Sequence, residues 1–273
     1  MPLKATNYVV AFGASCALIA GAAAASNVVW HQSFETDTAG WFDSSNGWAG
    51  SVTRVASGHN GVTSSSGDYH AVVVQGPHPS ASIDTGGFSQ FDGYRSVWPA
   101  GGFRAAIDVY LDMSMSIGEG FDYSVAANRQ TGAHLRDFIF HVARDADGIV
   151  VGGSNNSNFT TQNRKAENHH LVTTSGWFTL EHVFRDFGDG SLAVDLNLLD
   201  SGGDVLFTET RHTADDLIAT IVGGNRYSWF THVSVDGGIA VDSHMLSIIP
   251  LPTPIGLGAV GLMGVFAVRR RRA

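Results

Sequence analysis

Five polar residues alternate with apolar ones in three stretches of the sequence and form the best candidate for a ligand-binding surface. They are Asp108, Tyr110, Glu181, Asp195 and Asn197. Successive residues of a strand face opposite sides, so we expect all five to point away from the core. Carboxylates and an amide accept hydrogen bonds from hydroxyls, and an aromatic ring stacks on the C–H face of a sugar. The set therefore fits a sugar-binding face; the alternative is the solvated outer face that antiparallel sheets commonly have.

The same carboxylates also suggest a glycosidase pair, Glu181 with Asp195 or Asp108. Glycoside hydrolysis needs two carboxylates about 5–5.5 Å apart in retaining enzymes or about 6.5–9.5 Å apart in inverting ones. The E-x-D-x-x-E signature of laminarinase-type jelly rolls is absent, and so are a G-x-S-x-G serine elbow and a phosphate-binding loop. We therefore expect a non-enzymatic protein, with a secreted glycan-active hydrolase or lyase as the alternative.

The signals for a metal are weak. Asp145 and Asp147 stand in a D-x-D-G loop, but calcium takes about six to eight oxygen ligands. Aspartates in turns also bond their own backbone. We expect no cofactor, with calcium at this loop as the alternative. The histidines lack zinc-type spacing, so His141 and His182 are expected to be hydrogen-bonded within a sheet.

Two tryptophans are expected to play different parts. Trp48 stands in a loop rich in Gly, Ser and Asn and is the best exposed candidate for stacking on a sugar. Trp177 opens a patterned strand and is expected in the core.

Period-two alternation dominates the chain and predicts an all-β fold. From 103 to 112 an apolar set alternates with a more polar one, so one face of this strand is expected to be buried. Many short strands of this kind predict an antiparallel sandwich or barrel. The other clear examples are 138–143, 177–186 and 191–199.

Turn residues predict how the strands are connected. Glycine- and aspartate-rich turns at 187–190 and 200–204 predict an antiparallel three-strand meander. A second pair of strands is expected at 226–235 and 238–246. Only 213–220 has a short helical pattern.

The strand pattern resembles the concanavalin A-like and laminin-G-like jelly rolls. The resemblance rests on a first strand with Phe34-Glu35 and then Trp41, on the segment 107–112, and on the strand 176–181 with its glycine turn. It implies one antiparallel jelly-roll sandwich over 26–247. Such modules commonly bind glycans, sometimes with calcium.

The negative net charge of the body limits the classes of partner that it is expected to bind. Lys4 and four terminal arginines account for five of the 16 basic side chains, which leaves 11 against 25 acidic ones, a net of −14 for the body. Phosphate binding needs clustered Lys and Arg, so nucleic acid is not expected as a partner.

The amino terminus predicts export. Lys4 supplies a positive n-region, 8–20 an apolar h-region and 22–25 a small-residue cleavage region, so 1–25 is expected to be a signal peptide. Cys16, the only cysteine, lies inside it, so the mature body has no disulfide.

The carboxyl terminus joins a proline spacer over 248–254 to a membrane segment over 255–273. The apolar run 255–268 rises about 21 Å as a helix, short for a bilayer core of about 30 Å. The positive-inside rule places the arginines that follow in the cytoplasm. The motif residues are Pro250, Pro252, Thr253 and Pro254, and the cluster is Arg269, Arg270, Arg271 and Arg272.

This order of a proline motif, an apolar helix and terminal arginines resembles the PEP-CTERM sorting signal. In that family the tail tethers an exported protein to the inner membrane until a protease, exosortase, cuts near the proline motif. The family's Pro-Glu-Pro is here Pro252-Thr253-Pro254. The resemblance implies a transient membrane tether and then a place at the cell surface or in the extracellular matrix, in contact with exopolysaccharide. The alternatives are an uncut membrane anchor and a purely structural matrix protein.

Overall fold

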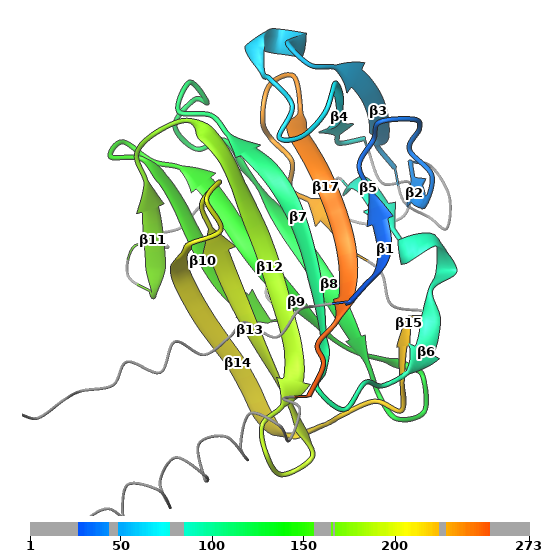
Figure 1. The fold of residues 1–273 in the computed structure, drawn as a ribbon. Coiled ribbons are helices and arrows are strands. Elements are labelled where there is room, and N and C mark those ends of the chain that lie inside the picture. Colours follow the sequence, from blue (N-terminus) through cyan, green and yellow to red (C-terminus); the bar gives the residue numbers. More distant parts are fainter. Residues whose placement is uncertain are drawn as a thin grey trace, which may run out of the picture.

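Antiparallel strands make up most of the computed structural model, together with the 3-10 turns η1 (His59–Gly61) and η2 (Phe91–Gly93) (Figure 1). The predicted all-β fold is confirmed. No helix in the described part of the chain is long and apolar enough to cross a membrane. The predicted signal peptide, most of the predicted sorting tail and Trp48 lie outside the described residues. The structure describes residues 27–43, 49–76, 85–155, 165, 167–223 and 228–251.

The larger sheet, sheet A, has the strand order β14-β13-β12-β7-β17-β4-β3, and β1 pairs with β17. Its strands β12, β13 and β14 form the predicted three-strand meander. The strands of sheet A are β1 (Asn27–Gln32), β3 (Ser51–Ala56), β4 (Tyr69–Val74), β7 (Phe103–Leu111), β12 (Gly176–Asp186), β13 (Ser191–Leu199), β14 (Val205–Leu217) and β17 (Ile239–Ile248).

The second sheet, sheet B, has the order β11-β10-β9-β8-β16-β5-β2, and β15 pairs with β6 in a separate ribbon. Sheets A and B lie face to face as a sandwich, with β12, β7 and β17 in front of β8 and β9 in Figure 1. The remaining strands are β2 (Trp41–Phe42), β5 (Thr85–Ser89), β6 (Arg95–Val97), β8 (Gly120–Asn128), β9 (His134–Arg144), β10 (Ile149–Asn155), β11 (His169–Val172), β15 (Ile221–Gly223) and β16 (Ser228–Thr231).

The core lies between the two sheets and is rich in aromatic rings. The predicted apolar faces of β7, β12 and β13 all point into it, as alternation requires. Phe184 stacks on Phe103 with ring centroids 4.4 Å apart and meets Phe138 of sheet B edge-on at 5.7 Å. Pairs of rings in such arrangements add to the free energy gained by burying them.

Two histidines lie in this core in the neutral form. The Nε2–H of His182 on sheet A donates to the carbonyl of Phe138 on sheet B at 3.0 Å, so His182 is hydrogen-bonded as predicted, but to the opposite sheet and not within its own. His244 Nε2 lies 3.2 Å from the hydroxyls of Tyr123 and Ser228. Burial lowers the pKa of each of these two histidines to about 3, because an imidazolium there would lose its hydration.

Three predictions of local structure were wrong. The expected helix at 213–220 is largely the end of β14, where Leu217 still pairs with Ser191 of β13. Arg136 of β9 binds Asp216 through two hydrogen bonds of 2.6 and 3.0 Å, which also favours the extended form. Pairing with neighbouring strands here overrides a weak local propensity.

The second wrong prediction is that the strands at 226–235 and 238–246 pair with each other. β16 pairs with β5 and β8 in sheet B, whereas β17 pairs with β7 in sheet A, so the chain crosses between sheets at this point.

The third wrong prediction concerns the first strand, which was expected to contain Phe34 and Glu35 but ends at Gln32. The backbone turns at Phe34, with a φ of 59°, where the N–H donates to Gln32 Oε1 at 2.7 Å.

Candidate binding site at one end of the sandwich

Three of the five predicted polar residues lie in a self-paired ladder on the outer face of sheet A. Glu181 lies 2.8 Å from Arg104 and accepts a hydrogen bond of 2.9 Å from the amide of Asn197. Asp195 accepts two hydrogen bonds from Arg185, at 2.6 and 2.9 Å. The predicted orientation is confirmed, but the acceptors are occupied by the protein's own donors. This part of the face therefore has little left to offer a sugar hydroxyl.

Asp108, the fourth, helps to fix the loop 57–68 on the same face. Its carboxylate accepts from Thr179 Oγ1 at 2.6 Å and from Ser65 Oγ in the loop at 2.7 Å. Asp242 stands directly opposite Asp108 on β17 and accepts from the backbone N–H of Ser66 at 3.1 Å. The loop is thus tied to two adjacent carboxylates.

Trp177 supports this loop from the sheet, so its predicted place in the core was wrong. The indole N–H donates to the carbonyl of Thr63 at 2.7 Å, and the ring meets Tyr110 edge-on at 5.6 Å. Trp177 shares the outward parity of Glu181 on β12, while Phe178 packs against the core. The alternation was read correctly for the strand, but its first aromatic residue was assigned to the wrong face.

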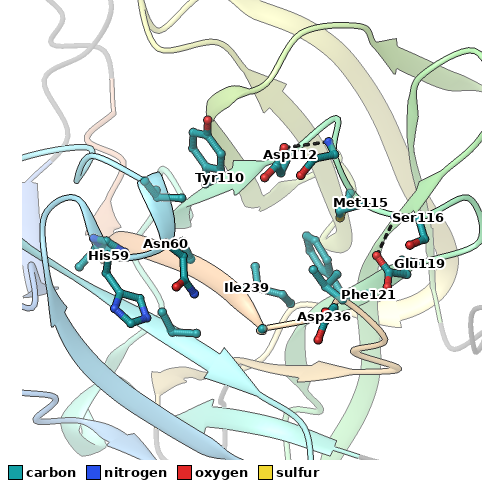
Figure 2. A pocket seen from close by; sticks show the side chains of 18 residues that line it. His59, Asn60, Tyr110, Asp112, Met115, Ser116, Glu119, Phe121, Asp236 and Ile239 are labelled. Carbon is teal, nitrogen blue, oxygen red and sulfur yellow. Dashed lines mark hydrogen bonds between the residues drawn. The ribbon is translucent and has the colours of Figure 1, made fainter.

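A pocket of about 260 Å³ opens where the loop 57–68, the β7–β8 connection and the start of β17 meet (Figure 2). Tyr110 lines it, and it is the one residue of the predicted five that does. Figure 2 shows the other labelled side chains arranged around the same space. The polar residues in the lining of this pocket include Asn60, His70, Asp112, Glu119 and Asp236.

The carboxylates of this pocket have no cationic partner in the described part of the chain. Asp112 accepts from the backbone N–H of Ser114 at 2.8 Å, and Glu119 accepts from that of Ser116 at 2.8 Å. No Arg, Lys or His is paired with either of them or with Asp236 among the described residues. Glu181 and Asp195 in the ladder, by contrast, each face an arginine. Uncompensated negative charge is therefore concentrated at the pocket.

His70, in the lining of the pocket, adds an unused polar group. It is fully buried, and its Nδ1 lies 3.0 Å from Ser64 Oγ, while its Nε2 has no hydrogen-bond partner in the part of the chain that the structure describes. Burial lowers the pKa of His70, so the imidazole is neutral at pH 7 and does not offset the carboxylates.

Sequence reasoning missed Glu119 and Asp236 because they lie in connections between strands, whereas Asp112 ended the alternating segment 103–112 but was not selected as a site residue. The period-two signal that selected Tyr110 does not extend into loops. Acidic residues next to glycine in turns, as in Glu119-Gly120 and Asp236-Gly237, were the available signal. Nothing in the sequence showed that these turns converge at one end of the sandwich.

The loop with Asp145 and Asp147 is closed by a lysine. Lys165 Nζ lies 2.8 Å from Asp145 and 2.6 Å from Asp147, in the position that a bound cation would take. The Lys165 ammonium lowers the pKa of the Asp145 carboxyl. Within the described ranges, no group of three or more His, Cys, Asp or Glu side chains is arranged to hold a metal ion.

Comparison with known proteins finds likeness in fold alone. No protein-family profile and no curated protein sequence matches the chain. Among solved structures it is similar to the CBM2 module of the evolved Dit of Lactobacillus casei BL23 phage J-1, with 16% identity, a TM-score of 0.43, and coverage of 83% of this chain and 97% of that one.

Two further structures are similar to the chain. A marine PL-14 alginate lyase from Aplysia kurodai has 9% identity and a TM-score of 0.45, over 82% of this chain and 100% of its own. The exoplasmic/lumenal domain of VIP36, in its Ca²⁺/Man3GlcNAc-bound form, has 10% identity and a TM-score of 0.37, over 77% and 87%. At such low identities and TM-scores, these likenesses carry no argument about function.

Proposed function

We propose that this protein is exported and binds polysaccharide at the cell surface or in the extracellular matrix, through the pocket at Tyr110. The observation that supports the proposal is the composition of that pocket, in which an aromatic ring, an amide and three carboxylates share about 260 Å³. A ring for stacking and several acceptors for hydroxyls are what a sugar needs. Binding of this kind requires no catalytic step.

The negative charge of the pocket restricts the class of polysaccharide that we expect to bind there. A polyuronate would bring its carboxylates against Asp112, Glu119 and Asp236, and this like-charge contact is unfavourable. A neutral sugar avoids that repulsion, and a sugar with a free amine gains attraction. We therefore propose a neutral or amine-bearing polysaccharide as the ligand.

For the fold and the route of export, we propose a concanavalin A-like jelly roll, a cleaved signal peptide over 1–25 and a PEP-CTERM-like tail processed by exosortase. The end of the described chain supports this arrangement. β17 ends at Ile248, the N–H of Ile249 donates to the carbonyl of Gly102 at 3.0 Å, and Leu251 is 58% exposed. Leu251, within the predicted proline spacer, is thus exposed to solvent just after the last strand.

Affinity electrophoresis tests the binding proposal. The protein should be retarded in gels that contain a neutral or amine-bearing polysaccharide, and Tyr110→Ala should reduce the retardation. A protein that migrates equally in all such gels and in the empty gel would refute polysaccharide binding and favour a purely structural matrix role.

Two epitope tags test the sorting proposal separately. One is placed just before Pro250 and the other after Arg272. Processing predicts that the first tag reaches the cell surface or medium on a shortened chain without the second. If both tags remain on one full-length membrane band, the segment is an uncut anchor.

A further inference from the structure

A serine, a histidine and an aspartate form one hydrogen-bonded chain on the outer face of sheet B. Nδ1 of His141 lies 2.7 Å from Asp122 Oδ1, and its Nε2 lies 2.5 Å from Ser154 Oγ. A carboxylate can only accept, so Nδ1 carries the hydrogen and Nε2 accepts from the serine hydroxyl. None of these three residues lines the pocket in Figure 2.

The register of three neighbouring strands brings the three side chains together. Asp122 of β8 and Gly152 of β10 both stand directly opposite His141 of β9. Ser154 is the next residue after Gly152 on the same face of β10, and its hydroxyl reaches the imidazole of His141. The arrangement therefore follows from the register of β8, β9 and β10.

A second imidazole holds the other oxygen of the aspartate. His232 Nδ1 lies 3.1 Å from Asp122 Oδ2, and the residue has a φ of 51° just after β16 ends. This left-handed conformation costs free energy in any residue but glycine, and such strain is often found at functional sites. Asp122 is thus fixed through both oxygens.

We propose that Ser154, His141 and Asp122 form a nucleophilic site that hydrolyses carboxylic esters with small acyl groups. Serine hydrolases of unrelated folds use the same connectivity, in which the aspartate orients the histidine and the histidine deprotonates the serine. Ser154 is the most exposed of the three residues, at 8%, whereas Asp122 and His141 are each 1% exposed. Because Ser154 is largely buried, the proposal is restricted to small acyl groups. This activity is independent of the proposed binding role.

In the first half of the reaction, Ser154 Oγ attacks the ester carbonyl carbon while its proton passes to His141 Nε2. The carbon–oxygen bond to the alcohol then breaks, and the leaving alkoxide takes that proton. In the second half, water attacks the acyl-serine and gives a proton to His141. Ser154 Oγ leaves and recovers this proton, so the products are the alcohol and the carboxylic acid. Asp122 acts through His141 and is a positioning residue.

Backbone N–H groups near Ser154 are the candidates to hold the oxyanion. β11 pairs with β10 only from Ile149 to Gly152. In the described residues, the pairing of β10 with β11 therefore stops two residues before Ser154. Donors of this kind stabilise the negative oxygen that develops during acyl transfer.

The test uses the full chain, a fluorophosphonate probe and 4-nitrophenyl acetate. The probe should form one covalent adduct, which peptide mass spectrometry should locate at Ser154. Ser154→Ala and His141→Gln should each lower ester hydrolysis by at least about 100-fold. Ser124→Ala is the matched control, because Ser124 is also a buried serine on the outer face of sheet B. This control should retain both the adduct and the rate.

Asp122→Asn separates a positioning role from a structural one. It should lower kcat with little change in KM, because the amide no longer fixes the histidine tautomer. Native protein without an adduct at Ser154 would overturn the proposal, whatever the variants do. So would unchanged hydrolysis by folded Ser154→Ala.

Discussion

Asp108 and Asp242 stand directly opposite each other on β7 and β17, and both are bound to the loop 57–68. Asp242 is fully buried, and burial raises its pKa to about 6, with the negative charge of Asp108 acting in the same direction. The backbone N–H groups of Ser66 and Ser243 oppose this shift without cancelling it. Above pH 6 the folded protein therefore holds a carboxylate in an unfavourable place beside the pocket loop.

The burial of Asp242 beside Asp108 predicts that the free energy of unfolding depends on whether Asp242 is ionised. A carboxyl whose folded pKa lies above its unfolded value contributes stability below the unfolded pKa, about 3.8 here, and this contribution is lost as the pH rises through about 6. Asp242→Asn should remove this pH-dependent part of the free energy of unfolding between pH 4 and 6. Urea unfolding of both proteins across this range measures it, and identical pH slopes would contradict the assignment. Asp204→Asn, an exposed turn residue, is the control for the charge change.

His182 and His244, the two histidines in the core, predict the opposite pH dependence of the free energy of unfolding. A histidine whose folded pKa is about 3 must lose a proton to fold, so its stabilising contribution is present above the ordinary histidine pKa of 6.5 and is lost as the pH falls from there towards 3. Replacing His182 or His244 with Gln should make the free energy of unfolding less sensitive to acid. His59→Gln, at an exposed position, should leave the slope unchanged, which circular dichroism during urea unfolding can check.

A third prediction concerns the ring cluster between the sheets. Phe184→Ala should lower the free energy of unfolding by about 3–5 kcal/mol, because a buried ring is replaced by a cavity. Phe187→Ala, three residues on and 53% exposed, should cost only about 0.5 kcal/mol. Equal losses in denaturant unfolding would show that Phe184 does not pack as described.

The sequence was sufficient for elements whose alternation is regular and whose turns are glycine-rich. The apolar set of β7, from Phe103 to Leu111, and the meander of β12, β13 and β14 were predicted because both signals are local. The sheet to which a strand belongs is not local. β16 and β17 show the same alternation, yet their partners lie far away in the chain.

The candidate site was predicted only in part for the same reason. Tyr110 was found because it alternates within a strand, whereas Glu119 and Asp236 come from separate loops that meet only in the folded protein. Ser154 and His141 were missed as a pair because their contact depends on strand register, which the sequence does not show. The predicted face at Glu181 and Asp195 was placed correctly, but its pairing with arginines could not be predicted from alternation.

The last prediction concerns the charge of the pocket. Asp112→Asn, Glu119→Gln and Asp236→Asn should each weaken the retention of an amine-bearing polysaccharide, and the loss should shrink as salt is raised, because exposed charges are screened. The same variants should improve, or leave unchanged, the weak retention of a polyuronate. Affinity electrophoresis at two ionic strengths measures both effects.

Asp204→Asn provides the matched control, since it removes one negative charge from the turn between β13 and β14, outside the pocket. If it weakens retention as much as Asp236→Asn does, net charge governs binding and the pocket has no special part in it. If wild-type protein binds the polyuronate more tightly than the amine-bearing polymer, the proposed ligand class is wrong, even though polysaccharide binding itself stands. Loss of binding in Tyr110→Ala alone would point to stacking on a neutral sugar, because that change leaves all three carboxylates in place.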